Sequence, residues 1–304
     1  MLEVRALGRL EALYDNTPLH FPTEKVPELL CFLLLQEGRQ IPRTVAAEAL
    51  WPMRPPGRAR RSLSTALWRL RQAIRQADST APNYIIARRQ TLAFDASHPY
   101  RFDVAEFQQT AIAGMKGRLP CRDGRLTQLC AGVDLYEGPL LSGAYNDWCL
   151  AERERLQLLY MQCLKRLLHH HRLDGSTDAA EETAQRLLAI DPLQEDVHRE
   201  LMRCFVSVGQ RARALEQYER CWRALRAELR IEPAEETRML YQRIRTNEDA
   251  VRQELGVRDV RGQYEAALDR LQDALEEVEE SWSSMQGTRD ESLRAASPQP
   301  PFHS

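Results

Sequence analysis

The pattern of apolar and polar positions divides the chain into a short mixed part and a long helical part. Residues 2–6 and 10–14 alternate apolar and polar side chains, which predicts short β-strands. The next elements we expect are a helix over 23–38 capped by Thr23, a short helix over 45–50, a helix over 58–75 and a hairpin over 84–94. Strands, three helices and a terminal hairpin in this order predict a winged helix-turn-helix.

Helical periodicity dominates from residue 102 onward. The predicted helices cover 103–115, 123–136, 147–171, 179–190, 195–208, 211–229 and 235–245. Several of them end at a proline, such as Pro192 or Pro233, and small and aromatic residues such as Ala214 and Tyr218 recur between these stops. Helix pairs with such punctuation are typical of degenerate tetratricopeptide-like repeats. The predicted fold class is therefore mainly α with a small β component, a winged helix-turn-helix followed by a TPR-like helical repeat domain.

Beyond residue 246 the pattern changes again. Apolar residues recur at heptad spacing from Val257 to Met285, opposite an acidic face. This segment is compatible with a coiled-coil seam or with a helix docked back on the repeats. We expect domains over 1–98 and 99–246, an amphipathic heptad-patterned helix over 247–286 and a disordered tail over 287–304.

The helix predicted over 58–75 has the make-up of a DNA-reading helix. One face carries an apolar stripe, formed by Leu63, Ala66, Leu67, Leu70 and Ile74. A rotation of about 100° per residue places Arg61, Thr65, Trp68 and Gln72 on the opposite face. The segment contains no acidic residue, whereas a solvated helix usually interleaves acids with its arginines. A merely basic surface helix is the plain alternative.

Charge is distributed unevenly between the two parts of the chain. Residues 1–100 hold 14 Arg or Lys against 9 Asp or Glu, whereas the other 204 residues hold 28 against 35. Residues 38–90 contain eleven arginines but only two acidic residues, Glu48 and Asp78. A basic module followed by an acidic one indicates nucleic-acid binding by the basic part.

Other classes of chemistry find no support in the sequence. The seven scattered cysteines include no C-x-x-C pair, which favours buried free thiols in a reducing cytosol. Three consecutive histidines, His169 to His171, point about 100° apart on a helix and cannot chelate one ion together. There is no P-loop, G-x-S-x-G or H-E-x-x-H motif, no secretory signal and no membrane-spanning run. We expect a soluble cytoplasmic protein that is not an enzyme and has no cofactor and no metal.

Two family resemblances rest on these residues. Residues 1 to about 95 resemble the OmpR-type winged-helix domain, in the version found in SARP-type antibiotic regulatory activators. The following part resembles the bacterial transcriptional activator domain of the same regulators. Its matching stretches are Asp134–Leu141 with Trp148, Ala189–Glu195, Ala214–Arg220 and Glu228–Pro233. The sequence begins at the winged helix, so we expect no receiver domain.

The resemblance implies which side chains meet DNA. The contact role falls on Arg61, Thr65, Trp68, Arg69 and Arg71 of the recognition helix, and on Arg88 and Arg89 of the wing. The wing departs from the family's glycine-rich tip, because Arg88-Arg89-Gln90 stands there.

These observations predict a sequence-specific DNA-binding transcriptional regulator that acts as an activator. The resemblance implies binding at direct repeats in double-stranded promoter DNA, self-association on DNA, contact with RNA polymerase and no membrane partner. The alternative from another class is a helical-repeat protein–protein adaptor whose basic N-terminal domain binds protein or RNA.

Overall fold

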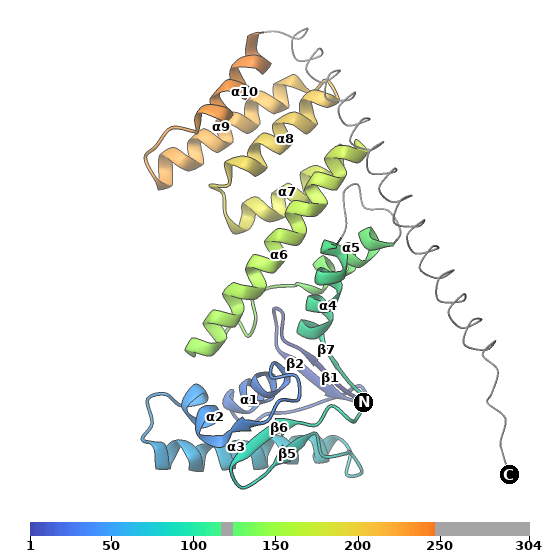
Figure 1. Ribbon diagram of the computed structural model, residues 1–304, viewed down its shortest axis with the longest axis vertical. Helices are drawn as coiled ribbons and strands as arrows, with labels where there is room; N and C mark the ends of the chain where they lie inside the picture. The colour runs from blue at the N-terminus through green and yellow to red at the C-terminus, as the bar shows by residue number, and fades with distance from the viewer. Residues whose placement is uncertain (117–123, 247–304) are drawn as a thin grey trace, which may run out of the picture. The chain divides into compact units, whose positions relative to one another are not determined.

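The computed structural model describes residues 1–116 and 124–246 (Figure 1). The chain divides into two compact units, Met1–Cys204 and the part from Phe205 onward, and each is described by itself. The predicted heptad helix over 247–286 and the predicted tail over 287–304 lie outside the described residues.

The N-terminal part of the first unit is a winged helix, as predicted (Figure 1). Its elements are β1 (Leu2–Arg5), β2 (Glu11–Tyr14), β3 (Thr17–Pro18), α1 (Lys25–Leu34), β4 (Ile41–Pro42), α2 (Arg43–Leu50), α3 (Pro56–Ala77), β5 (Ile85–Ala87), β6 (Thr91–Phe94) and β7 (Tyr100–Phe102). One sheet has the strand order β3-β2-β1-β7, with β7 parallel to β1, and the second has the order β4-β6-β5. Because β7 lies beyond residue 98 and still pairs with β1, the sheet extends past the predicted domain boundary.

The core of the winged helix lies between α1, α3 and the second sheet. Helix α1 is buried over nearly its whole length, and Leu29, Leu30 and Leu33 are completely inaccessible. The prediction that Thr23 caps this helix is wrong. Helix α1 starts at Lys25 with Glu24 at the cap position, and no side-chain cap bond forms there. The backbone carbonyl of Thr23 accepts from the Val26 amide instead, at 3.1 Å.

The rest of the first unit is helical. It contains α4 (Asp103–Met115), α5 (Arg125–Leu135), α6 (Asp147–Asp174), α7 (Thr177–Ile190) and the start of α8 (Glu195–Ser207). Helices α4 and α5 approach closely where each has a glycine: a Cβ on Gly114 would lie 2.9 Å from the Leu129 Cβ, and one on Gly132 would lie 2.8 Å from the Thr110 Oγ1. Helix α6 ends at Asp174, and the φ of +78° at the following Gly175 allows the reversal into α7.

The second unit holds the end of α8, α9 (Arg211–Glu228) and α10 (Glu235–Thr246). The rings of Tyr218 and Tyr241 stack between the last two helices, with centroids 4.1 Å apart. Arg211 donates to the carbonyls of Ile244 and Arg245, which ties the start of α9 to the end of α10. The helical-repeat architecture predicted from the Pro-punctuated periodicity is thus confirmed.

Candidate nucleic-acid interface

Helix α3 buries one face and exposes an arginine-rich one, as its periodicity predicts. Proline fits at its first position because the first N–H groups of a helix have no intrahelical acceptor. The whole predicted apolar stripe is buried, and Leu63 and Leu70 are completely inaccessible. The exposed side presents Arg58, Arg60, Arg61, Ser64, Thr65 and Trp68. The helix contains no acid, so its positive charge stays available to an anionic ligand.

Trp68 is the least expected member of this face. Its ring is 60% exposed, although a large aromatic side chain gains most from burial. It stands among charged and hydroxyl side chains, one turn beyond Thr65 and two turns beyond Arg61. Such a ring can pack on a sugar or on a thymine methyl in a groove.

The hydroxyl groups of α3 donate hydrogen bonds to backbone carbonyls of the same helix. Thr65 Oγ1 donates to the Arg61 carbonyl at 3.1 Å, and Ser64 Oγ donates to the Arg60 carbonyl at 3.1 Å. The Thr65 oxygen therefore keeps its lone pairs as acceptors toward the outside, whereas Ser64 Oγ also accepts from the Arg43 guanidinium at 3.0 Å. Thr65 thus presents an oxygen acceptor and a methyl group, which suits a base amino group or a thymine.

Arg71 lies differently from the other predicted contact residues. It is half-buried, and its terminal nitrogen donates to the backbone carbonyl of Ile85 in β5 at 3.0 Å. Its Nε is buried without a hydrogen-bond partner. This geometry ties the C-terminal half of α3 to the first wing strand. Arg69 is also half-buried, whereas Arg61, Thr65 and Trp68 are exposed.

The wing is the hairpin of β5 and β6, and its tip carries Arg88 and Arg89, both exposed. The Arg88 amide closes the tip by donating to the Thr91 carbonyl at 2.9 Å. The amide of Arg43 donates to the Gln90 carbonyl at 2.8 Å, so the tip is also bonded to the start of α2. Both guanidinium groups of the tip stay accessible.

Sequence reasoning missed two arginines that border the exposed face of α3. The Arg43 guanidinium donates to Ser64 Oγ at 3.0 Å, and that of Arg54 donates to Ser62 Oγ at 2.6 Å. Arg43 comes from the first residue of α2 and Arg54 from the loop before α3. Only their position in a basic stretch could have signalled them, because the periodicity of α3 does not extend to them.

The described residues offer little for thiol or metal chemistry. Burial raises the pKa of the Cys31 thiol well above its ordinary value and that of the Cys163 and Cys204 thiols to about 11, which keeps them protonated. Within the described ranges, no group of three or more His, Cys, Asp or Glu side chains could hold a metal ion. None of the helices in residues 1–116 and 124–246 combines the length and apolar content needed to cross a bilayer.

Comparison with known proteins agrees with this architecture. Residues 102–245 match the family model of the bacterial transcriptional activator domain. The chain is 28% identical over 246 residues to the regulatory protein AfsR of Streptomyces coelicolor, covering 80% of this chain but only 24% of that protein. It is 24% identical over 256 residues to the transcriptional regulatory protein MoaR1 of Mycobacterium tuberculosis, covering 80% of this chain and 79% of the relative.

A solved structure shares the fold. The structure of Mycobacterium tuberculosis EmbR in complex with a low-affinity phosphopeptide superposes with a TM-score of 0.60 at 22% identity, over 85% of this chain and 71% of that one. The winged helix precedes the helical part in the fold, and the family model matches that helical part. Residues 102–245 thus match the bacterial transcriptional activator domain and follow a winged helix, an arrangement in which the chain resembles the SARP-type regulators.

Proposed function

We propose that this regulator activates transcription by reading promoter DNA with α3 in the major groove and the wing on the backbone beside it. The observation that carries the proposal is the acid-free outer face of α3, where Arg61, Thr65 and Trp68 stand exposed. Unneutralised arginines on one face repel each other. When a polyanion binds, these arginines take the place of its counterions, and the repulsion is relieved. The relatives described as regulatory proteins support the same activity.

Each side chain has a part that follows from its chemistry. The Arg61 guanidinium can form a bidentate pair with guanine, Thr65 offers an acceptor and a methyl group, and Trp68 covers a sugar or thymine methyl. Arg69 reads from the flank of the helix. Arg88 and Arg89 neutralise phosphates at the wing. We assign Arg71 to holding the wing against α3 rather than to a base, because Ile85 already occupies its guanidinium.

We further propose that copies of the chain bind head to tail at direct repeats in the cytoplasm, and that the helical domain brings protomers together and contacts RNA polymerase. The resemblance to SARP-type activators supports this assignment, as does the presence of a helical-repeat surface beside the winged helix. The rival function, an adaptor whose basic domain binds protein or RNA, has no comparable support among the relatives.

The test uses the full chain with DNA found by genome-wide mapping of its bound sites. Fluorescence anisotropy at two salt concentrations compares the bound promoter with random duplex. Arg69→Ala should cost about 1 to 3 kcal/mol on the promoter and relax the preference at one base pair. Arg88→Ala should weaken binding to every sequence and reduce the salt slope by about one. Equal binding of both DNAs by the wild-type protein would contradict sequence-specific recognition.

A further inference from the structure

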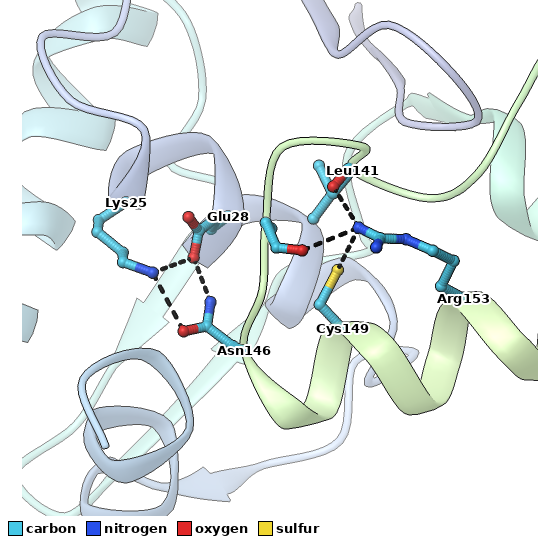
Figure 2. Close-up of polar contacts among 7 residues, drawn as sticks. Lys25, Glu28, Leu141, Asn146, Cys149 and Arg153 are labelled. Carbon is cyan, nitrogen blue, oxygen red and sulfur yellow. Dashed lines mark hydrogen bonds and ion pairs between the residues drawn. The ribbon is translucent and has the colours of Figure 1, made fainter. Parts of the chain in front are cut away.

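A polar ring of two buried residues, Glu28 and Asn146, and the half-buried Lys25 joins α1 of the winged helix to the segment that leads into α6 (Figure 2). The Glu28 carboxylate, on a residue only 5% exposed, accepts from Lys25 Nζ at 2.6 Å and from Asn146 Nδ2 at 2.6 Å. Lys25 Nζ also donates to Asn146 Oδ1 at 3.2 Å, which closes the ring. A buried carboxylate is tolerated only while such partners are in place. The Glu28 carboxylate therefore depends on Asn146, which lies 118 positions later in the chain.

Arg153 holds the same segment from the other side (Figure 2). Its guanidinium donates to the backbone carbonyls of Leu140 at 2.9 Å, Leu141 at 2.6 Å and Ala144 at 2.9 Å. Leu141 has a φ of +44°, a left-handed conformation that costs energy for a side chain of this size. The carbonyl bonds to Arg153 help to keep the segment in this unfavourable conformation.

The segment also bonds to the residues that directly follow β1. The Leu141 amide donates to the Ala6 carbonyl at 3.0 Å, and Leu140 forms an isolated antiparallel bridge with Leu7. Asp103 secures the same end of β1, because its Oδ2 accepts from the amides of Ala6 at 2.7 Å and Leu7 at 2.8 Å. The two residues after β1 are thus held by the helical part of the unit.

Helix α1 connects this assembly to the DNA-reading helix. It carries Glu28 near its start and packs against α3. The ring of Phe32, one turn beyond Glu28, contacts Trp148 edge to face with centroids 5.1 Å apart. Since close-packed interiors transmit displacements, a movement of the segment at Asn146 shifts α1 and, with it, the support of α3.

We infer that residues 138–153 form a coupling clamp that sets the position of the reading helix, with Glu28, Asn146 and Arg153 as its positioning residues. The inference rests on the proposed DNA binding. A change in the activator domain acts on DNA affinity through the clamp. Because coupling between two sites is reciprocal, DNA binding in turn tightens the clamp.

The decisive variant is Asn146→Ala, measured in the full chain. Tyr145→Ser is its matched control, because Tyr145 is the adjacent residue and is 78% exposed. We expect Asn146→Ala to weaken promoter binding about 5- to 20-fold, within the usual range of coupling between sites. The salt slope should stay unchanged because no phosphate contact is lost. Circular dichroism at the assay temperature shows that the variant is folded, which separates repositioning from unfolding.

Two further measurements keep the inference falsifiable if Asn146→Ala does not fold. Arg153→Lys keeps one charged donor but loses the fork that binds three carbonyls, and it should give the same loss at constant salt slope. Hydrogen exchange of the wild-type chain should show slower exchange in residues 138–153 when promoter DNA is bound. Wild-type affinity in both variants, or unchanged exchange on DNA binding, would overturn the clamp. Failure of the wild-type chain to bind promoter DNA would instead overturn the proposed function.

Discussion

Replacing Arg71 by Met tests whether this arginine holds the wing or reads DNA. Methionine keeps an unbranched apolar stem and removes the guanidinium. The bond lost is the one from the guanidinium to the Ile85 carbonyl, 3.0 Å long. A hydrogen bond from a charged donor contributes about 1.5 to 3 kcal/mol to stability. The buried and unpartnered Nε offsets part of this, because removing it relieves a desolvation cost.

The net expectation for Arg71→Met is a loss of about 1 kcal/mol, which corresponds to about 2 to 4 °C in the midpoint of thermal unfolding for a domain of 150 to 250 residues. Arg61→Ala is the matched comparison, since Arg61 is exposed on the same helix. Its stability should stay within about 0.5 kcal/mol of the wild type. Its promoter affinity should fall, because a base contact is removed.

Thermal unfolding and DNA titrations at two salt concentrations separate the two roles. A holding role lowers the unfolding midpoint of Arg71→Met, leaves the salt slope of DNA binding unchanged and weakens binding to all sequences alike. A reading role leaves unfolding unchanged and alters the preference at one base pair or the salt slope. The second result would refute the assignment of Arg71 to the wing and return it to the contact residues predicted from the resemblance.

Two other positions give predictions for stability. Gly114→Ala should destabilise the chain by about 1 to 2 kcal/mol in urea unfolding, because a Cβ 2.9 Å from the Leu129 Cβ overpacks α4 against α5. This cost exceeds the gain from the higher helix propensity of alanine. Gly57→Ala is the control, because it has open space around it and should be neutral or slightly stabilising. The pKa of His171 is held below its ordinary value, first by burial and then by the charge of His170. The unfolded chain therefore binds this proton at a higher pH than the folded chain, so wild-type stability should fall as the pH drops below about 6.5. His171→Gln should flatten that decline. Equal pH profiles of the two proteins would contradict a role of His171 in the pH dependence.

The features that were predictable from sequence depend on local periodicity. The stripe from Leu63 to Ile74 is buried, and Arg61, Thr65 and Trp68 point outward as the helical rotation requires. The rotation works because every residue of a regular helix turns by the same angle. It fixes where a side chain leaves the helix. It does not fix where the end of a long side chain lies, which is why the bond from Arg71 to the Ile85 carbonyl could not be predicted.

The features that were not predictable depend on contacts between distant segments. Strand β7 is only three residues long and forms because β1 offers it a parallel edge. Nothing within residues 138–146 indicates that Leu141 adopts a positive φ, since its conformation depends on Arg153 and on the Ala6 carbonyl. Likewise Thr23 has the residue type of a helix cap, yet the chain enters α1 two residues later. For β7 and Leu141 the deciding bonds come from distant segments, whereas at Thr23 the local bond from the Val26 amide replaces the expected side-chain cap.

The arginines of the winged helix and the clamp divide by what their guanidinium groups meet. Arg71 and Arg153 donate to backbone carbonyls, which are neutral acceptors on irregular or edge segments, so these two arginines organise the protein itself. Arg61 and Arg88 are exposed in a basic stretch, where their charge raises the free energy of the unbound chain through repulsion; Arg61 makes one long bond, 3.4 Å, to the Gly57 carbonyl of its own helix. Only the second group gains from a polyanion. The same residue type thus serves two purposes. Charge counting indicated the basic region, whereas the bond from Arg71 to the Ile85 carbonyl supports our proposal that this arginine holds the wing, a role that the family resemblance did not imply.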